Sequence, residues 1–189
     1  MTTTMRLCLL AHPATAAMRS GRFPDDDPLD PRGLEEAAGF ARGFRLRART
    51  TVLRSPAACA RQTADACGVD AATEAALADV DYGTWRGRAI KDVAATEIDA
   101  WLCDPRFAAH GGESLADVAV RVGAWLDGLN ASGDDMLAIT HAAVIRAAVA
   151  HALGAPDHAM FRIEVAPLAR VVLTRSARGW VWSAAESGI

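Results

Sequence analysis

Two short apolar runs, each followed closely by a histidine, are the strongest constraint on how this chain can fold. Residues 7–10 lead through Ala11 to His12, and residues 136–140 lead directly to His141. A continuous apolar run of this length is typical of a strand that is buried on both faces of a parallel sheet. Because the carboxyl ends of parallel strands meet at one edge of a sheet, the two histidines are predicted to face the same crevice.

Helical and strand patterns alternate along most of the remaining sequence. Capping residues and apolar periodicity predict helices at residues 31–43, 55–67, 89–102, 115–129 and 142–153. A further strand is expected at residues 50–53, an irregular strand or loop at 77–82, and short strands at 161–165, 169–174 and 180–183. The fold expected from this order is α/β, a three-layer α/β/α sandwich in one domain spanning residues 1–189, with a mostly parallel sheet closed by a β-hairpin.

The composition excludes several classes of protein. The 189 residues are 51% hydrophobic with a formal net charge of −3, which fits one domain with a substantial core. Nucleic acid and membrane surfaces need a basic face, so neither is expected as a partner. The first apolar run is too short for a signal sequence or a membrane span, and the cysteines show no CxxC pair, so a cytoplasmic protein with reduced thiols is expected.

Five segments, in a fixed order, carry a resemblance to a known family. They are residues 28–37, 55–64 (Ser-Pro-Ala-Ala-Cys-Ala-Arg-Gln-Thr-Ala), 77–87, 111–114 (Gly-Gly-Glu-Ser) and 140–146 (Thr-His-Ala-Ala-Val-Ile-Arg). Together with the paired histidines they resemble the histidine phosphatase superfamily, also called the phosphoglycerate mutase-like family. The resemblance covers nearly the whole chain and implies phosphoryl transfer through a covalent phosphohistidine.

The resemblance also implies a role for each matching residue. His12 takes the place of the nucleophile, since a neutral imidazole is nucleophilic near pH 7. His141 would hold a phosphoryl oxygen, helped by the backbone N–H groups of the helix that begins at Ala142. The general acid of the family corresponds to Asp79, one methylene shorter than the usual Glu, and Asp81 is the alternative.

The sequence departs from the family pattern at the groups that bind phosphate. Ala11 and Cys59 stand where the family has arginines, and Pro13 stands where it has glycine. One well-placed arginine contributes roughly 10³ to 10⁵ in phosphoryl-transfer rate, so another cation is needed. The candidate substitutes are Arg61, Arg54, Arg19, Arg22 and Arg146. Arg61 lies two positions beyond Cys59, about 200° around a helix, so it can replace that arginine only where the segment is not helical.

Two further residues are candidates for substrate contact. His110 and Glu113 belong to the loop that carries Gly-Gly-Glu-Ser, which in the family lies near the pocket. His110 is a candidate phosphate ligand or proton donor, with an exposed loop histidine as the alternative. A metal site on these two residues would lack a third ligand nearby in sequence, so neither a metal nor a cofactor is expected. Cys59 also lacks the arginine six residues later that a cysteine-based phosphatase needs, because that residue is Asp65.

Two classes of function are compatible with these residues. The first is a phosphomonoesterase, monomeric or homodimeric, that acts on a small phosphorylated metabolite through a phosphohistidine. The second is a noncatalytic or repurposed relative that binds an anion or a protein partner in the inherited crevice. Retention of His12, His141 and Asp79 favours the enzyme, whereas loss of both arginines favours the second class. A mutase fits less well than a phosphatase, because it would need more positive charge in the pocket.

Overall fold

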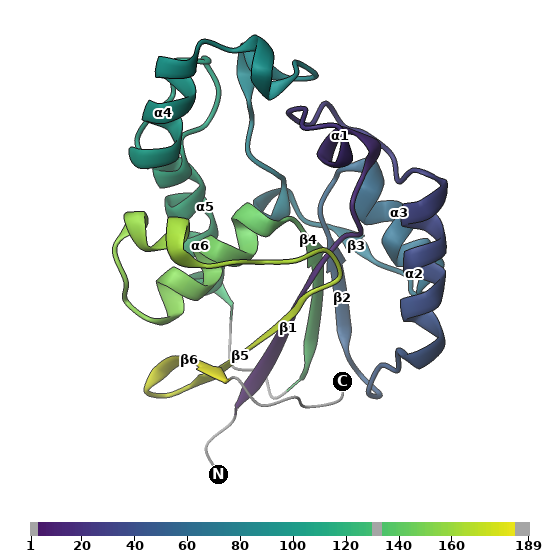
Figure 1. The fold of residues 1–189 in the computed structure, drawn as a ribbon. Helices are drawn as coiled ribbons and strands as arrows, with labels where there is room; N and C mark the ends of the chain where they lie inside the picture. The colour runs from purple at the N-terminus through teal and green to yellow at the C-terminus, as the bar shows by residue number, and fades with distance from the viewer. Residues whose placement is uncertain (1–3, 130–133, 184–189) are drawn as a thin grey trace.

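A mixed sheet of six strands forms the centre of the computed structural model, which describes residues 4–129 and 134–183 (Figure 1). The strands are β1 (Met5–Ala11), β2 (Thr51–Arg54), β3 (Ala72–Thr73), β4 (Met136–Thr140), β5 (Arg170–Ser176) and β6 (Gly179–Ser183). Their order across the sheet is β3-β2-β4-β1-β5-β6. The first four are parallel, and β5 and β6 form an antiparallel hairpin at one edge. The predicted mostly parallel sheet closed by a hairpin is therefore confirmed.

Helices cover both faces of this sheet. They are α1 (Ala16–Arg19), α2 (Pro31–Gly43), α3 (Ala58–Ala66), α4 (Ala95–Cys103), α5 (Leu115–Gly128) and α6 (Ala142–Ala152). The caps expected from the sequence are present. The Asp30 carboxylate accepts a hydrogen bond from the Gly33 amide at 2.7 Å before α2, and Ser114 and Asp117 form a capping box before α5.

Alternating side chains of β1 join the sheet to its two helical layers. Leu7 and Leu9 pack with buried residues of α5 and α6, whereas Cys8 and Leu10 pack with Phe44 and with buried residues of α3. The period of two along a strand sends successive side chains to opposite faces. In Figure 1, α2 and α3 accordingly lie on one side of the sheet, and α5 and α6 on the other.

Two of the predicted elements are wrong. Residues 89–102 do not form one helix, since a 3-10 turn at Ile90–Asp92 is separated from α4 by Val93, which is extended and buried beside Phe23 and Trp85. The apolar residues that predicted one helix thus belong to two separate elements. Residues 161–165 are not a strand, because a 3-10 helix (Asp157–Arg162) occupies the start of this segment and places Met160 in the core with residues of α5 and α6.

The helices of the described segments give no sign of a membrane span. None of them is both long enough and apolar enough to cross a bilayer.

Candidate active site

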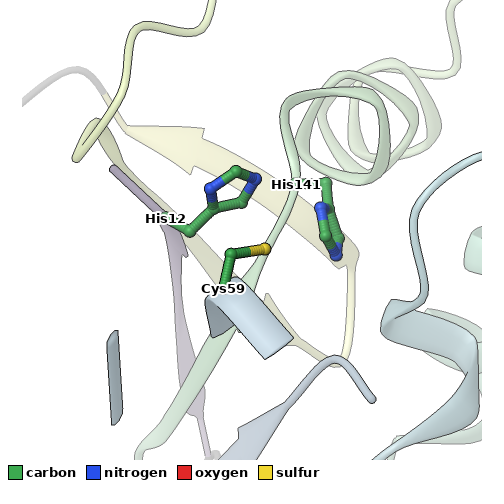
Figure 2. A group of neighbouring side chains, drawn as sticks. All are labelled: His12, Cys59 and His141. Carbon is green, nitrogen blue, oxygen red and sulfur yellow. The ribbon is translucent and has the colours of Figure 1, made fainter. Parts of the chain in front are cut away.

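The two histidines lie side by side because their strands are neighbours. β1 and β4 are parallel with Ala11 opposite Thr140, so His12 and His141 follow paired positions at the same edge of the sheet. The His12 amide donates to the Thr140 carbonyl at 3.1 Å. The ring centroids lie 4.9 Å apart at an interplanar angle of 69°. Figure 2 shows the two rings next to each other, and both line one cavity, as predicted.

Backbone geometry fixes the orientation and the tautomer of His12. Its Nδ1 lies 2.6 Å from the Pro13 carbonyl oxygen, which can only accept, so Nδ1 carries the hydrogen and donates it. In the neutral ring, Nε2 therefore holds the lone pair. Burial, followed by the neighbouring His141, lowers the pKa of His12 to about 4. The imidazole is thus uncharged at neutral pH and suited to nucleophilic attack through Nε2.

The low pKa of His12 predicts a loss of stability in mild acid. The unfolded chain takes up a proton near pH 6.5 and the folded chain only near pH 4, so the free energy of unfolding falls as the pH falls through this window. A shift of this size lowers the free energy of unfolding by about 3 kcal/mol once the pH is below both pKa values. Urea unfolding of the wild type and of His12→Ala between pH 7 and pH 4 should show a smaller decrease for the variant. Equal slopes for the two proteins would contradict the prediction.

His141 is held by residues from two other segments. Its Nε2 lies 2.8 Å from the hydroxyl of Ser55, the residue that follows β2, and its Nδ1 lies 3.4 Å from a carboxylate oxygen of Asp79. The latter is an electrostatic contact, since Nδ1 is buried with no hydrogen-bond partner among the described residues. Burial lowers the pKa of His141 despite Asp79. Because His141 caps α6, the start of that helix faces the same crevice.

The two candidate acids occupy different places. Asp79 lines the cavity that also contains both histidines. Asp81 lies outside that cavity, with one carboxylate oxygen 3.6 Å from Nε of Arg86. Of the two, Asp79 is the one that shares a cavity with His12.

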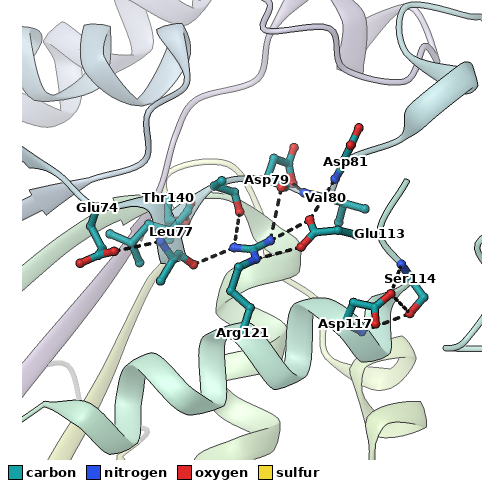
Figure 3. A network of polar contacts seen from close by, with 12 residues as sticks. Glu74, Leu77, Asp79, Val80, Asp81, Glu113, Ser114, Asp117, Arg121 and Thr140 are labelled. Atoms are coloured by element: carbon teal, nitrogen blue, oxygen red, sulfur yellow. Dashed lines mark hydrogen bonds and ion pairs between the residues drawn. The ribbon is translucent and has the colours of Figure 1, made fainter. Parts of the chain in front are cut away.

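A guanidinium from α5 fixes the loop that carries Asp79. Arg121 makes a bidentate pair with Glu113, with both N···O distances 2.9 Å. The same guanidinium donates to the carbonyls of Ala76 and Ala78 at 2.7 and 3.1 Å (Figure 3). Glu113 in turn accepts from the Asp81 amide at 3.1 Å. Glu113 thus holds the loop and is absent from the residues that line the histidine cavity.

Replacement of Arg121 by methionine should destabilise the fold and displace Asp79. It removes the hydrogen bonds to three carbonyls, that of Asp79 included, and leaves the partly buried Glu113 carboxylate without its partner, at a cost of about 2–3 kcal/mol. Arg32→Met removes the exposed pair with Glu36 on α2 and is the matched control, expected to leave the free energy of unfolding nearly unchanged. Urea unfolding of both variants tests this, and equal losses would refute a special role for Arg121.

The cavity at the histidines has a volume of about 360 Å³ and a largely apolar wall. Its apolar wall includes Met18, Phe23, Tyr82, Ile90 and Trp101. Among the described residues, the arginines that line it are Arg22 and Arg146. Arg146 projects from the second turn of α6, and its Nε is buried with no hydrogen-bond partner in the described segments. Of the substitutes suggested by the sequence, Arg22 and Arg146 are therefore the two that line the cavity, and Arg146 is the one with a buried Nε that lacks a partner in the described segments.

The remaining arginine candidates are outside the residues that line this cavity. Arg19 is paired with Asp30 and Glu36, at 3.1 Å in each case. Arg54 donates to the Ser55 carbonyl at 3.1 Å, and Arg61 is exposed on α3. Because residues 58–66 are helical, Arg61 does not take the position of the arginine that Cys59 replaces.

His110 directly precedes the Gly-Gly-Glu-Ser loop and lies in an aromatic cluster. Its ring centroid lies 5.0 Å from that of Trp85 and 6.0 Å from that of Phe107. Its Nδ1 accepts from the Gly112 amide at 3.1 Å. The side chain is buried, so the exposed alternative is wrong, and it is not among the residues that line the histidine cavity.

Cys59 lies beside the two histidines. Figure 2 shows its sulfur pointing toward the space between the rings, and one ligand atom from each of His12, Cys59 and His141 lies within 4.8 Å of the others. Burial, followed by the Asp79 charge, raises the pKa of the thiol to about 12. A protonated thiol is a poor nucleophile, so Cys59 does not compete with His12 for that role. The sequence did not indicate this cluster, nor the contact between Ser55 and His141.

Comparison with known proteins identifies the family. The model of the histidine phosphatase superfamily (branch 1) matches residues 7–187. The chain belongs to this superfamily. It is 28% identical over 195 aligned positions to the probable phosphoglycerate mutase GpmB of Yersinia enterocolitica, covering 94% of this chain and 90% of that protein.

Solved structures share the histidine phosphatase fold seen here. A mycobacterial glucosyl-3-phosphoglycerate phosphatase in complex with VO3 matches with a TM-score of 0.83 and 23% identity, covering 94% of this chain and 96% of that one. A phosphoserine phosphatase mutant from Entamoeba histolytica, in complex with phosphoserine, matches with a TM-score of 0.79 and 16% identity, covering 95% of both chains. At these identities the likeness concerns the fold.

Proposed function

We propose that this histidine phosphatase family member is a phosphomonoesterase that acts on a small phosphorylated metabolite through a phosphohistidine at His12. The observation that carries the proposal is the orientation of His12. Its Nδ1 donates to the Pro13 carbonyl, which leaves the Nε2 lone pair available in a cavity shared with His141 and Asp79. The assigned family and the phosphatases that share the fold support the same reaction class.

In this reaction the phosphoryl group moves to His12 and then to water. Nε2 of His12 forms a bond to phosphorus while the bond from phosphorus to the alcohol oxygen breaks, and Asp79 in its acid form protonates that oxygen. The Pro13 carbonyl stabilises the positive charge that the ring acquires. Water then attacks phosphorus as Asp79 takes up its proton. The N–P bond breaks, and neutral His12 and inorganic phosphate are released.

The anionic oxygens need positive groups other than the two missing arginines. Ala142 and Ala143 at the start of α6 line the cavity, and a helix N-terminus favours anions. His141 is placed to donate a hydrogen bond to a phosphoryl oxygen, and Arg146 supplies a full charge from the same helix. α6 therefore provides most of the phosphate site in this proposal.

The apolar wall favours a substrate with an apolar or aromatic alcohol. Phe23, Tyr82 and Trp101 form one side of the cavity, and their rings offer stacking and contact area but few hydrogen-bond donors for a sugar. Within the class of small phosphate esters, aryl and alkyl esters are accordingly expected to bind better than sugar phosphates.

The direct test is hydrolysis of a panel of aryl, alkyl and sugar phosphates by the wild-type protein, combined with capture of the phosphoenzyme. Rapid quenching at alkaline pH should retain the phosphoryl group on His12, and acid should release it, because an N–P bond is acid-labile. A protein that hydrolyses no ester and captures no phosphoryl group would overturn the proposal.

The second candidate function is binding without turnover. It is favoured by Ala11 and Cys59, which leave two phosphate-binding positions without charge. A noncatalytic protein would bind inorganic phosphate or vanadate in a calorimetric titration yet show no phosphoenzyme. The two functions are therefore separated by the capture experiment and not by binding alone.

A further inference from the structure

We propose that His12, Cys59 and His141 form a binding site for a thiophilic divalent cation of the Zn²⁺ type, which competes with the phosphate ester for the cavity. Only the inhibitory consequence rests on the proposed phosphatase function. The metal site itself stands on the three side chains and is tested separately below.

The three side chains come together from three different elements. His12 follows β1, Cys59 lies in the first turn of α3, and His141 caps α6. Their exposed fractions are 8%, 4% and 3%, and their ligand atoms lie within 4.8 Å of one another. Tetrahedral zinc with nitrogen ligands at 2.0–2.1 Å and sulfur at 2.3 Å needs separations of roughly 3.4 Å. Movements of about 1 Å, within the reach of side-chain rotation, would close the site.

The hydrogen bonds around the histidines are those that metal ligands require. A ligating imidazole binds metal with one nitrogen while the other donates to a nearby oxygen. His12 donates from Nδ1 to the Pro13 carbonyl, so Nε2 is the available ligand atom. His141 has its Nε2 at the Ser55 hydroxyl, and its Nδ1 is buried with no hydrogen-bond partner in the described segments. A cation at Nδ1 would satisfy this nitrogen.

The carboxylates around the cavity also favour a bound cation. Three carboxylates line it, Asp26, Asp27 and Asp79, against the guanidinium groups of Arg22 and Arg146. Asp79, with an oxygen 3.4 Å from Nδ1 of His141, is placed as a fourth ligand, and water is the alternative. The family arginine at position 59 would repel a metal ion. Its replacement by cysteine removes that charge and adds a soft ligand, which favours Zn²⁺ over Mg²⁺ or Ca²⁺.

Coordination and phosphoryl transfer exclude each other at this site. Nε2 of His12 has one lone pair, and a metal that shares it leaves none for attack on phosphorus. The Cys59 thiol loses its proton to solvent when the sulfur binds the metal, so binding should tighten as the pH rises. The bound cation would thus prevent nucleophilic attack by His12 without any change in the fold.

The experiment is a titration of the full-length protein with Co²⁺, followed by displacement with Zn²⁺. Bound Co²⁺ with a cysteine ligand gives a thiolate charge-transfer band in the near ultraviolet. It also gives absorption bands in the visible region, with the high intensity that is typical of tetrahedral Co²⁺. The wild type is expected to show both at one Co²⁺ per chain, and Zn²⁺ should remove them. Cys59→Ala and His141→Gln should abolish the charge-transfer band or weaken binding by at least about tenfold. Cys103→Ala changes an exposed cysteine of α4 and should retain the charge-transfer band.

The outcomes separate the metal site from the phosphatase reaction. Absence of the band in folded wild type, or its persistence in both Cys59→Ala and His141→Gln, would overturn the metal site. The band with no phosphatase activity would support the metal site and contradict the proposed function. Where the wild type is active, one equivalent of Zn²⁺ should inhibit it and a chelator should restore it. Full activity in the Zn²⁺-loaded protein would refute the competition.

Discussion

Replacement of His12 by alanine is expected to lower kcat/KM for phosphate ester hydrolysis by on the order of 10³-fold or more, because it removes the atom that forms the bond to phosphorus. Phosphoenzyme capture should be lost completely. KM should change much less than kcat, since α6 and Arg146 remain to bind the phosphate. The measurement is steady-state hydrolysis of the best ester in the panel, with rapid-quench capture on the same preparation.

A matched control distinguishes loss of the nucleophile from damage to the fold. His158→Ala changes an exposed histidine outside the residues that line the cavity and should retain the wild-type rate. Thermal unfolding of both variants at pH 7.5 shows whether each is folded. Equal hydrolysis by wild type and folded His12→Ala would eliminate His12 as the nucleophile, whatever the result for binding.

The pair of histidines could be predicted from the sequence because their positions depend on backbone topology. Two buried apolar runs define two parallel strands, and the residues that follow them must lie at one sheet edge. The structure places them after paired residues, Ala11 and Thr140. The prediction thus depended only on how the two strands pair, and it required no knowledge of side-chain conformation.

The environment of the histidines could not be predicted in the same way. Ser55 follows β2 and Cys59 lies in the first turn of α3, and both approach His141 through side-chain geometry that depends on how this segment packs on the sheet. Apart from the helical argument against Arg61, the sequence did not rank the arginine candidates. They differ in the structure because Arg19 is bound by two carboxylates, whereas Arg146 lies on the helix that follows His141.

The second large effect is expected at Arg146, one of the two arginines that line the histidine cavity and the one on the helix that follows His141. Arg146→Met keeps the aliphatic stem and removes the charge. It should lower kcat/KM by roughly 10²- to 10³-fold. This is no more than the smallest effect expected for an arginine that stabilises the transition state, because the backbone groups of α6 still bind the phosphate. Binding of inorganic phosphate, measured by calorimetry, should weaken in parallel. Arg146→Lys should recover part of the rate, since it restores the charge without the bidentate geometry.

Arg61→Met is the comparison that decides between the arginines. The sequence offered Arg61 as a substitute for the missing charge at position 59, but it is exposed on α3 and outside the residues that line the cavity. A methionine there should leave kcat/KM within about twofold of the wild type if Arg146 supplies the charge. The reverse result, a large loss at Arg61 and none at Arg146, would mean that α3 turns toward the phosphate when substrate binds. The charge would then enter the site from the helix that carries Cys59, and the same movement would separate Cys59 from the two histidines.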